Sequence, residues 1–222
     1  MSPRPGIGDA PERAVAAVRA PVQDRRMPES DVDLRARIVR GAADAYRATD
    51  FHQVGPVEVA AHAGVTVEEV RRAFPSWDLL VVAVVDRWSN GGRRATWSVA
   101  ERHGAVAYLR ARLEDGQREP GLVRLRIALL SAASAPGHPA SGWFRHQYTS
   151  SFEDVALALV RDVVAGRETR GTSPRHAAEQ LVALFEGLQL QAMLLDGTDL
   201  LAGWDRAVAR MRAGWAGAAV TA

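Results

Sequence analysis

The chain of 222 residues is long enough for one large domain, or for a small domain beside a larger one. Its 47% hydrophobic and 24% charged residues are typical of a globular protein, and no apolar run approaches the roughly 18 residues that cross a bilayer. The first 20 residues lack the pattern of a signal peptide. We therefore expect a cytoplasmic protein without membrane contact.

Cysteine is absent, which excludes disulfides, thiolate nucleophiles and Cys-based zinc sites, and no cofactor is expected. All 28 basic residues are arginines and the net charge is only +2, so the pI of about 9.6 reflects missing lysines rather than a surplus of positive charge. Residues 1–80 hold 11 arginines against 12 Asp and Glu. Overall charge therefore does not indicate binding to nucleic acid, and any such binding must rest on a local cluster of basic residues.

Residues 1–30 hold five prolines, so we expect a flexible extension, with a short helix possible at Glu12–Ala20. Arg25 and Arg26 in this arm are candidates for contact with a DNA groove or backbone, and solvated linker charges are the alternative. The periodic pattern begins only after this extension.

The first long helix is predicted from Leu34 to Thr49, because apolar residues recur there three and four positions apart. Asp31 or Asp33 is the expected N-cap. This helix has one apolar face and requires a partner.

Two short helices follow. Pro56 suits the first turn of a helix, and Gly64 suits its end. Thr66 and Glu69 have the spacing of a capping box, which predicts the start of a second helix at Val67–Phe74. The sequence therefore predicts two helices joined by a tight turn.

Pro75 ends the second short helix, and Ser76 with Asp78 begins another. Glycines weaken a helix by about 1 kcal/mol each relative to alanine, so SNGG at 89–92 is expected to interrupt it, either as a hinge or as a plain loop. Further helices are predicted at roughly 93–115, 119–133, 140–165, 174–195 and 199–216. The fold class is therefore predicted to be all-α, with no internal repeat.

Ala60, Gly64 and Val70 provide what a helix-turn-helix requires: a small residue at the crossing, a residue that tolerates positive φ, and an apolar anchor. Any tight corner between helices needs something similar. More specific are the preceding AADAY and the segment VEVAAHAGVTVEEVRRAFPSWDLL, which resemble the N-terminal domain of the tetracycline-repressor (TetR) family of transcriptional regulators. HPASGWF and LVALFEGLQLQAMLLDG resemble the ligand-binding domain of a large bacterial subgroup, so the resemblance spans roughly residues 34–216.

The resemblance implies an all-helical homodimer, with a three-helix helix-turn-helix DNA-binding domain at 31–78 and an effector-binding and dimerisation domain at 79–222. In that family the two recognition helices enter successive major grooves of the operator, and effector binding weakens operator affinity. We therefore expect a ligand-responsive DNA-binding regulator, most simply a repressor that a small molecule releases from double-stranded DNA.

Candidate DNA contacts cluster on the second short helix and beside it. Arg71 stands where the family has an aromatic phosphate contact, and Arg72 is a candidate for guanine readout. Glu68 either accepts a hydrogen bond from cytosine N4 or is a solvated acid at a helix start. The full set is Thr66, Val67, Glu68, Arg71, Arg72, Trp77 and Arg35.

The sequence departs from the family pattern where phosphate is usually held. Gly55 and Pro56 replace paired Ser or Thr, Ala73 replaces the usual His, and Trp77 replaces a basic residue. Proline also removes a backbone N–H at that helix start. These departures keep open an alternative: a sensor or interaction protein with the same fold and weakened or lost DNA binding.

The helix predicted at 181–195 is apolar on more than one face, and Trp204, Val208, Met211 and Trp215 form a stripe on the last helix. Pairing of both helices with their copies in a second subunit, as a four-helix bundle, is our homodimer prediction. A wholly intrachain core is the alternative.

Ligand pockets combine apolar walls with a few orienting polar groups. Few charged residues interrupt the aromatic segments of the larger region, so we expect a largely apolar small-molecule effector with little or no charge. The candidate ligand-binding residues are Trp97, Trp143, Phe144, Gln147, Tyr148, Phe185, Gln189 and Met193. An enzyme is not expected, because the six histidines show no paired ligand spacing and there is no nucleophile elbow.

Overall fold

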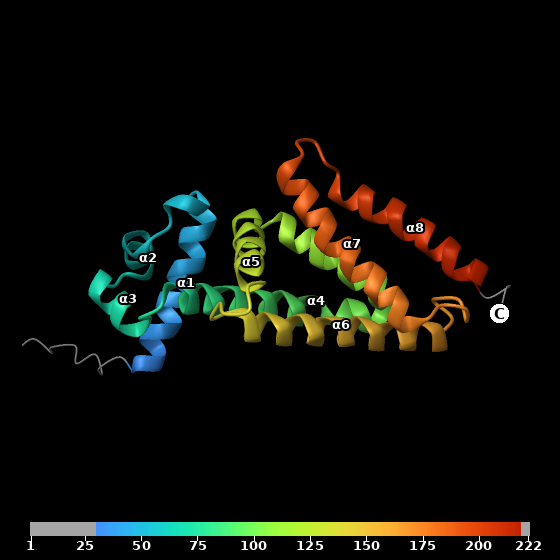
Figure 1. Cartoon of the computed structure of the whole chain (residues 1–222), viewed down its shortest axis with the longest axis horizontal. Helices are drawn as coiled ribbons and strands as arrows, with labels where there is room; N and C mark the ends of the chain where they lie inside the picture. The colour runs from blue at the N-terminus through green and yellow to red at the C-terminus, as the bar shows by residue number, and fades with distance from the viewer. Residues whose placement is uncertain (1–29, 219–222) are drawn as a thin grey trace, which may run out of the picture.

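The computed structural model describes residues 30–218, and this part of the chain forms eight α-helices and one short 3-10 helix, with no strand (Figure 1). The elements are α1 (Asp31–Ala48), η1 (Phe51–Gln53), α2 (Pro56–Ala63), α3 (Val67–Ala73), α4 (Trp77–Gln117), α5 (Pro120–Ala133), α6 (Ser141–Val164), α7 (Pro174–Leu194) and α8 (Leu200–Ala218). The all-α expectation is confirmed. The helix expected at Glu12–Ala20 and the arginines Arg25 and Arg26 lie outside the described residues.

Helices α1–α3 gather at one end of the molecule, and α7 and α8 lie at the other (Figure 1). The N-cap of α1 is Ser30, whose hydroxyl accepts a hydrogen bond from the Asp33 backbone N–H at 3.1 Å, rather than Asp31 or Asp33 as expected. Both aspartates instead lie in the first turn, where the positive end of the helix dipole stabilises a negative charge. At Gly41, α1 crosses α2 so closely that an added Cβ would lie 2.5 Å from the backbone nitrogen of Ala63.

The expected interruption at SNGG is wrong: α4 remains helical through residues 89–92. A Cβ on Gly92 would lie 3.2 Å from a carboxylate oxygen of Asp115 and 3.6 Å from the guanidinium carbon of Arg112. Gly92 therefore does not break the helix. Its lack of a side chain lets the segment around residue 92 pack closely against the later part of α4 that holds Arg112 and Asp115.

The chain reverses instead at Gly104, where φ is 87° and ψ is 179°. This divides α4 into a long arm, residues 77–103, and a short arm, residues 105–117. The buried carboxylate of Asp162 accepts hydrogen bonds from the backbone N–H of Ala105 and from Nε of Arg167, both at 2.7 Å. Asp162 therefore caps the start of the short arm.

Two apolar clusters lie along the molecule. The first joins α1–α3 to the start of α4, to α5 and to the start of α6, and the second joins the short arm to α6, α7 and α8. Within the first, Val84 and Val85 of α4 and Leu122 of α5 are fully buried. The domain boundary expected after residue 78 stays a prediction, and the apolar packing continues on both sides of it.

Helix α8 packs alongside α7 and buries Trp204, Val208 and Trp215 within the second cluster. Its Arg212 donates to both carboxylate oxygens of the buried Glu168, which follows α6. Within residues 30–218, none of the helices combines the length and the hydropathy needed to cross a membrane.

Candidate functional sites

The turn between α2 and α3 has the geometry that the sequence predicts. Gly64 adopts left-handed φ and ψ of 63° and 41°, and the next backbone N–H, at Val65, bonds to the Ala60 carbonyl at 3.0 Å. The Thr66 backbone N–H donates to Glu69 Oε2 at 2.8 Å, and the Glu69 N–H donates to Thr66 Oγ1 at 3.1 Å. This reciprocal capping fixes the start of α3.

Helix α3 has one buried face and one exposed face. Val70 and Ala73 are buried in the first cluster, and Val67 packs against it while partly exposed. The exposed face carries Glu68, Arg71 and Arg72, and Thr66 at the cap is exposed as well. Five of the seven residues predicted to contact DNA therefore belong to this short segment.

The other two predicted DNA-contact residues take different positions. Arg35 on α1 is exposed, with its guanidinium carbon 5.9 Å from the centre of the Phe74 ring. Trp77 at the start of α4 is partly buried against the first cluster, beside the hydroxyl of Tyr46. Burial raises the pKa of Tyr46 to about 12, and the hydrogen bond with Trp77 partly opposes this rise. Trp77 therefore contributes to the packing between α1 and α4.

The start of α2 already holds a carboxylate. The Gly55 backbone N–H donates to Oε2 of Glu58 at 2.9 Å, and Pro56 has no N–H to offer. A phosphate group at this helix end would compete with Glu58 and meet fewer donors than the family pattern provides.

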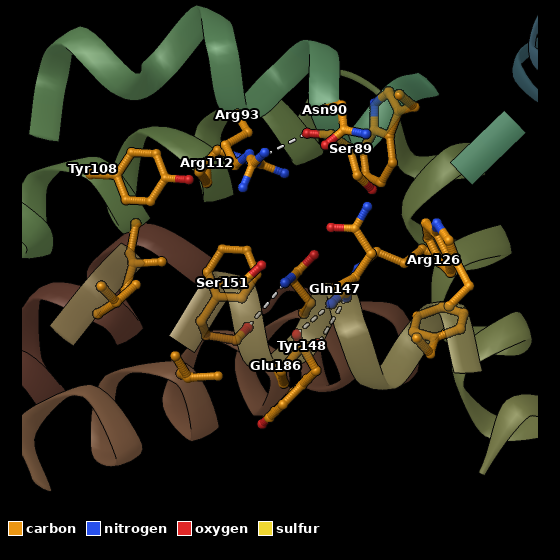
Figure 2. A pocket seen from close by; sticks show the side chains of 18 residues that line it. Ser89, Asn90, Arg93, Tyr108, Arg112, Arg126, Gln147, Tyr148, Ser151 and Glu186 are labelled. Carbon is orange, nitrogen blue, oxygen red and sulfur yellow. Dashed lines mark hydrogen bonds and ion pairs between the residues drawn. The ribbon is translucent and has the colours of Figure 1, made fainter. Parts of the chain in front are cut away.

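A pocket of about 90 Å³ lies between both arms of α4 and helices α5, α6 and α7 (Figure 2). This volume fits several water molecules or a small organic ligand, and is below the roughly 300 to 1,000 Å³ of pockets for drug-sized molecules. Figure 2 shows Tyr108, Arg112 and Asn90 from α4 facing Gln147, Tyr148 and Ser151 from α6 across the pocket.

Six of the eight predicted ligand-binding residues line this pocket: Trp143, Phe144, Gln147, Tyr148, Phe185 and Gln189. Trp97 is not among the lining residues, although its ring packs edge-on against the lining residue Tyr108, with the ring centres 5.6 Å apart. Met193 is also absent, since it lies one turn beyond Gln189 towards the end of α7. For these two, the structure gives no support for ligand contact.

Sequence reasoning missed the side of the pocket that α4 and α5 form. Trp88, Asn90 and Arg93 on the long arm line it, together with Arg112 on the short arm and Arg126 on α5. The pocket wall therefore carries more charge than the aromatic segments alone suggested. The spacing of four between Tyr108 and Arg112 was the available signal, since it places both on one helix face.

Asp86 connects the long arm to α6 beside the pocket. Its Oδ1 accepts hydrogen bonds from Asn90 Nδ2, Trp143 Nε1 and Gln147 Nε2, each at 3.0 Å. Two of these donors lie on α6, and all three residues line the pocket. Their orientation therefore depends on this one carboxylate.

The arginines of the pocket wall differ in their partners. Arg126 donates through both terminal nitrogens to Glu186 of α7, with Nη1 at 2.8 Å from Oε2. Arg93 pairs with Asp154 of α6 at 2.9 Å. Burial lowers the pKa of Arg112, which the neighbouring Tyr108 hydroxyl partly opposes.

The sequence matches no protein-family model and no curated protein. Solved structures do share the fold. A TetR transcription regulator from Haloarcula marismortui is 19% identical, covers 82% of this chain and 98% of its own, and superposes with a TM-score of 0.69.

A TetR-family transcriptional regulator from Streptomyces coelicolor is 23% identical over 79% of this chain and 87% of its own, with a TM-score of 0.56. A transcriptional regulator from Saccharomonospora viridis, solved in complex with choline, is 20% identical over 79% of this chain and 93% of its own, with a TM-score of 0.61. The resemblance found in the sequence is confirmed at the level of architecture: this chain has the fold of the TetR-family transcriptional regulators.

Proposed function

We propose that this protein is a ligand-responsive, DNA-binding transcriptional regulator, and that it acts as a repressor released from its operator by a small molecule. The observation that carries the proposal is the exposed pair Arg71 and Arg72 on a helix whose start and buried face are both fixed. A helix held in this way presents its outer side chains to a major groove without further folding.

Each exposed residue of α3 has an assigned role in this proposal. Arg71 grips phosphate, and Arg72 reads guanine through its two terminal nitrogens. Thr66, Val67 and Glu68 lie at the N-terminal end of the helix, which enters the groove first. Trp77 acts indirectly, through its packing beside Tyr46, and Arg35 contacts backbone from α1.

The long arm of α4 is the element that connects the two sites. It begins at Trp77, directly after α3, and continues without a break past Asn90 at the pocket. A ligand that displaces Trp143 or Gln147 disturbs their hydrogen bonds to Asp86 and changes the tilt of this arm. The ligand releases DNA only if it prefers the tilt that does not bind.

The homodimer of the proposal is supported by exposed apolar residues on α6 and α7. Leu190 and Leu194 lie one turn apart on α7, and Leu157 and Val164 are exposed on α6. The apolar stripe of α8 is already buried within the chain, so α7 supplies the free face. Leu190→Asp with Leu194→Asp should convert a dimer to a monomer in light scattering, whereas Ala192→Asp, also exposed on α7, serves as the matched control.

A second candidate function is a sensor with this fold that no longer binds DNA tightly. The carboxylate of Glu58 at the start of α2, and the exposed Glu68 on α3, favour it because both repel phosphate. Under this alternative the pocket is retained and the affinity for duplex DNA is weak and independent of sequence.

A gel shift with the DNA that flanks the gene distinguishes the two. The regulator predicts one preferred duplex, and Arg72→Ala should change which sequence is preferred, whereas Arg71→Ala should weaken binding to all sequences. Arg206→Ala, an exposed arginine on α8, is the matched control and should bind as the wild type. Equal binding to every duplex at low salt would leave the sensor as the better account.

A further inference from the structure

The pocket between α4, α5, α6 and α7 contains three guanidinium groups, and they are not equivalent. Arg126 and Arg93 each have a carboxylate partner, in Glu186 and Asp154. Arg112 has none within ion-pair distance among the described residues, and its hydrogen bond to the Ser89 carbonyl is long, at 3.4 Å. Arg112 is therefore a charge that the pocket encloses without neutralising.

The surroundings of Arg112 sharpen this difference. Asp115 attracts it through space but forms no ion pair with it, and Oδ1 of Asp115 bonds to the exposed Arg118 at 3.0 Å. The other close partner of Arg112 is the hydroxyl of Tyr108, which carries no charge at neutral pH. Arginine stays protonated at all physiological pH values, so the protein cannot remove this charge by releasing a proton. An enclosed cation of this kind is costly without an anion beside it.

In the part of the chain that the structure describes, the carboxylates near the pocket are already paired, so none is free for a cationic ligand as Arg112 is for an anion. Glu186 is neutralised by Arg126, and Oδ1 of Asp86 already accepts three N–H groups. We infer that the pocket binds a small organic carboxylate, with its two oxygens on the guanidinium of Arg112 (Figure 2). Its apolar body contacts Trp88, Trp143 and Phe185, which line the same pocket. This rests on the proposed function and refines its effector, keeping the expected apolar body and adding one negative charge.

The size of the pocket limits the ligand further. About 90 Å³ accommodates a compact monocarboxylate, and a drug-sized molecule would require the walls to move. Asn90 and Gln147 both use their amide nitrogens on Asp86, which leaves their amide oxygens as acceptors for a donor group on the ligand. A carboxylate with a hydroxyl or amide N–H therefore fits better than one without.

Isothermal titration of the full-length protein tests this, with mandelate, phenylacetate and hexanoate each compared with its neutral amide, and with choline as a cationic probe. Mandelate is phenylacetate with a hydroxyl and should bind the more tightly of the two. We expect at least one carboxylate to bind at least about tenfold more tightly than its amide. Arg112→Gln should abolish this preference and leave amide binding unchanged, and Arg112→Lys should retain part of it. The exposed Arg94→Gln on the same helix is the control.

Thermal unfolding of the ligand-free variants shows whether Arg112→Gln still folds, and its midpoint should equal or exceed that of the wild type because an enclosed charge has been removed. Tighter binding of choline or of an amide overturns the inference. So does undiminished carboxylate binding by Arg112→Gln, or the absence of binding by all three carboxylates at millimolar concentration. Gel shifts of the ligand-free protein are independent of these results, so the proposed function and this inference can fail separately.

Discussion

The surface of α3 and the pocket behind α4 use arginine in opposite ways. Arg71 and Arg72 lie exposed on a seven-residue helix that is fixed by its own caps, whereas Arg112 and Arg126 are enclosed among helices distant in the sequence. An exposed arginine can be replaced without disturbing the fold, because water solvates it in any case. An enclosed one is part of the packing, so its partners determine stability as well as binding.

The largest expected effect concerns the Arg126–Glu186 pair. Glu186→Leu leaves the guanidinium without its carboxylate, and we expect a loss of about 3 to 5 kcal/mol in the free energy of unfolding, measured by urea denaturation. Glu179→Leu on the same helix is exposed and should change stability by less than about 1 kcal/mol. Equal losses in the two variants would contradict the distinction between enclosed and exposed charges.

The next effect concerns the reversal at Gly104. An alanine there must adopt positive φ, and its Cβ would lie 2.5 Å from a carboxylate oxygen of Asp162, so we expect a loss of about 2 to 3 kcal/mol. Gly91→Ala, where an added Cβ meets open space in the helix, should instead stabilise by about 0.5 to 1 kcal/mol. Thermal unfolding followed by circular dichroism compares them. Opposite signs are the expected result, and a stable Gly104→Ala would place the reversal elsewhere.

An effect of similar size is expected only at alkaline pH. The pKa of Tyr46 is raised from 10 to about 12 in the folded protein. The protonated phenol therefore adds its full stabilisation to the free energy of unfolding below pH 10, and this stabilisation is lost as the pH rises through 12. The two-unit shift corresponds to about 2.7 kcal/mol. The chain has no lysine or cysteine, so tyrosines dominate side-chain titration in this window.

The variant that tests this effect is Tyr46→Phe. It should flatten the decline in stability between pH 10 and pH 12, as measured by urea denaturation across that range. Tyr148→Phe is the comparison, because burial also raises the pKa of Tyr148 but this residue is 44% exposed. It should change the slope less. An unchanged slope in Tyr46→Phe would mean that another group carries the decline.

The smallest expected effect on stability belongs to α3. Arg71→Ala and Arg72→Ala should each change the free energy of unfolding by no more than about 0.5 kcal/mol, because both side chains are exposed. Glu69→Ala should lower stability more than either arginine variant, since it removes half of the capping box. A large loss in either arginine variant would show that these residues hold the fold rather than face a partner.

The same contrast explains which features the sequence could predict. The turn at Gly64, the capping box of Thr66 and Glu69, and the helix bounds from α5 onward depend on neighbouring residues, so local patterns were sufficient. The reversal at Gly104 was missed because the buried carboxylate that stabilises it belongs to Asp162. This residue lies 57 positions after Ala105, whose backbone N–H donates a hydrogen bond to it.

The candidate pocket was likewise predicted only where it depends on residues close together in the sequence. The aromatic and amide residues of α6 and α7 were found because they cluster along two helices. The α4 and α5 side of the pocket, including Arg112, was missed because only the reversal at Gly104 brings Arg112 back beside the long arm. The SNGG segment was misread because the role of Gly92 is close packing against Arg112, which no local pattern reveals.

The central claim, that α3 presents arginines to duplex DNA, is tested most directly by the salt dependence of binding. Affinity of the full-length protein for its preferred flanking duplex should fall linearly with the logarithm of salt concentration, and Arg71→Ala should reduce that slope by about 1 while the sequence preference is kept. An unchanged slope in Arg71→Ala, together with no preferred duplex at low salt, would contradict the account.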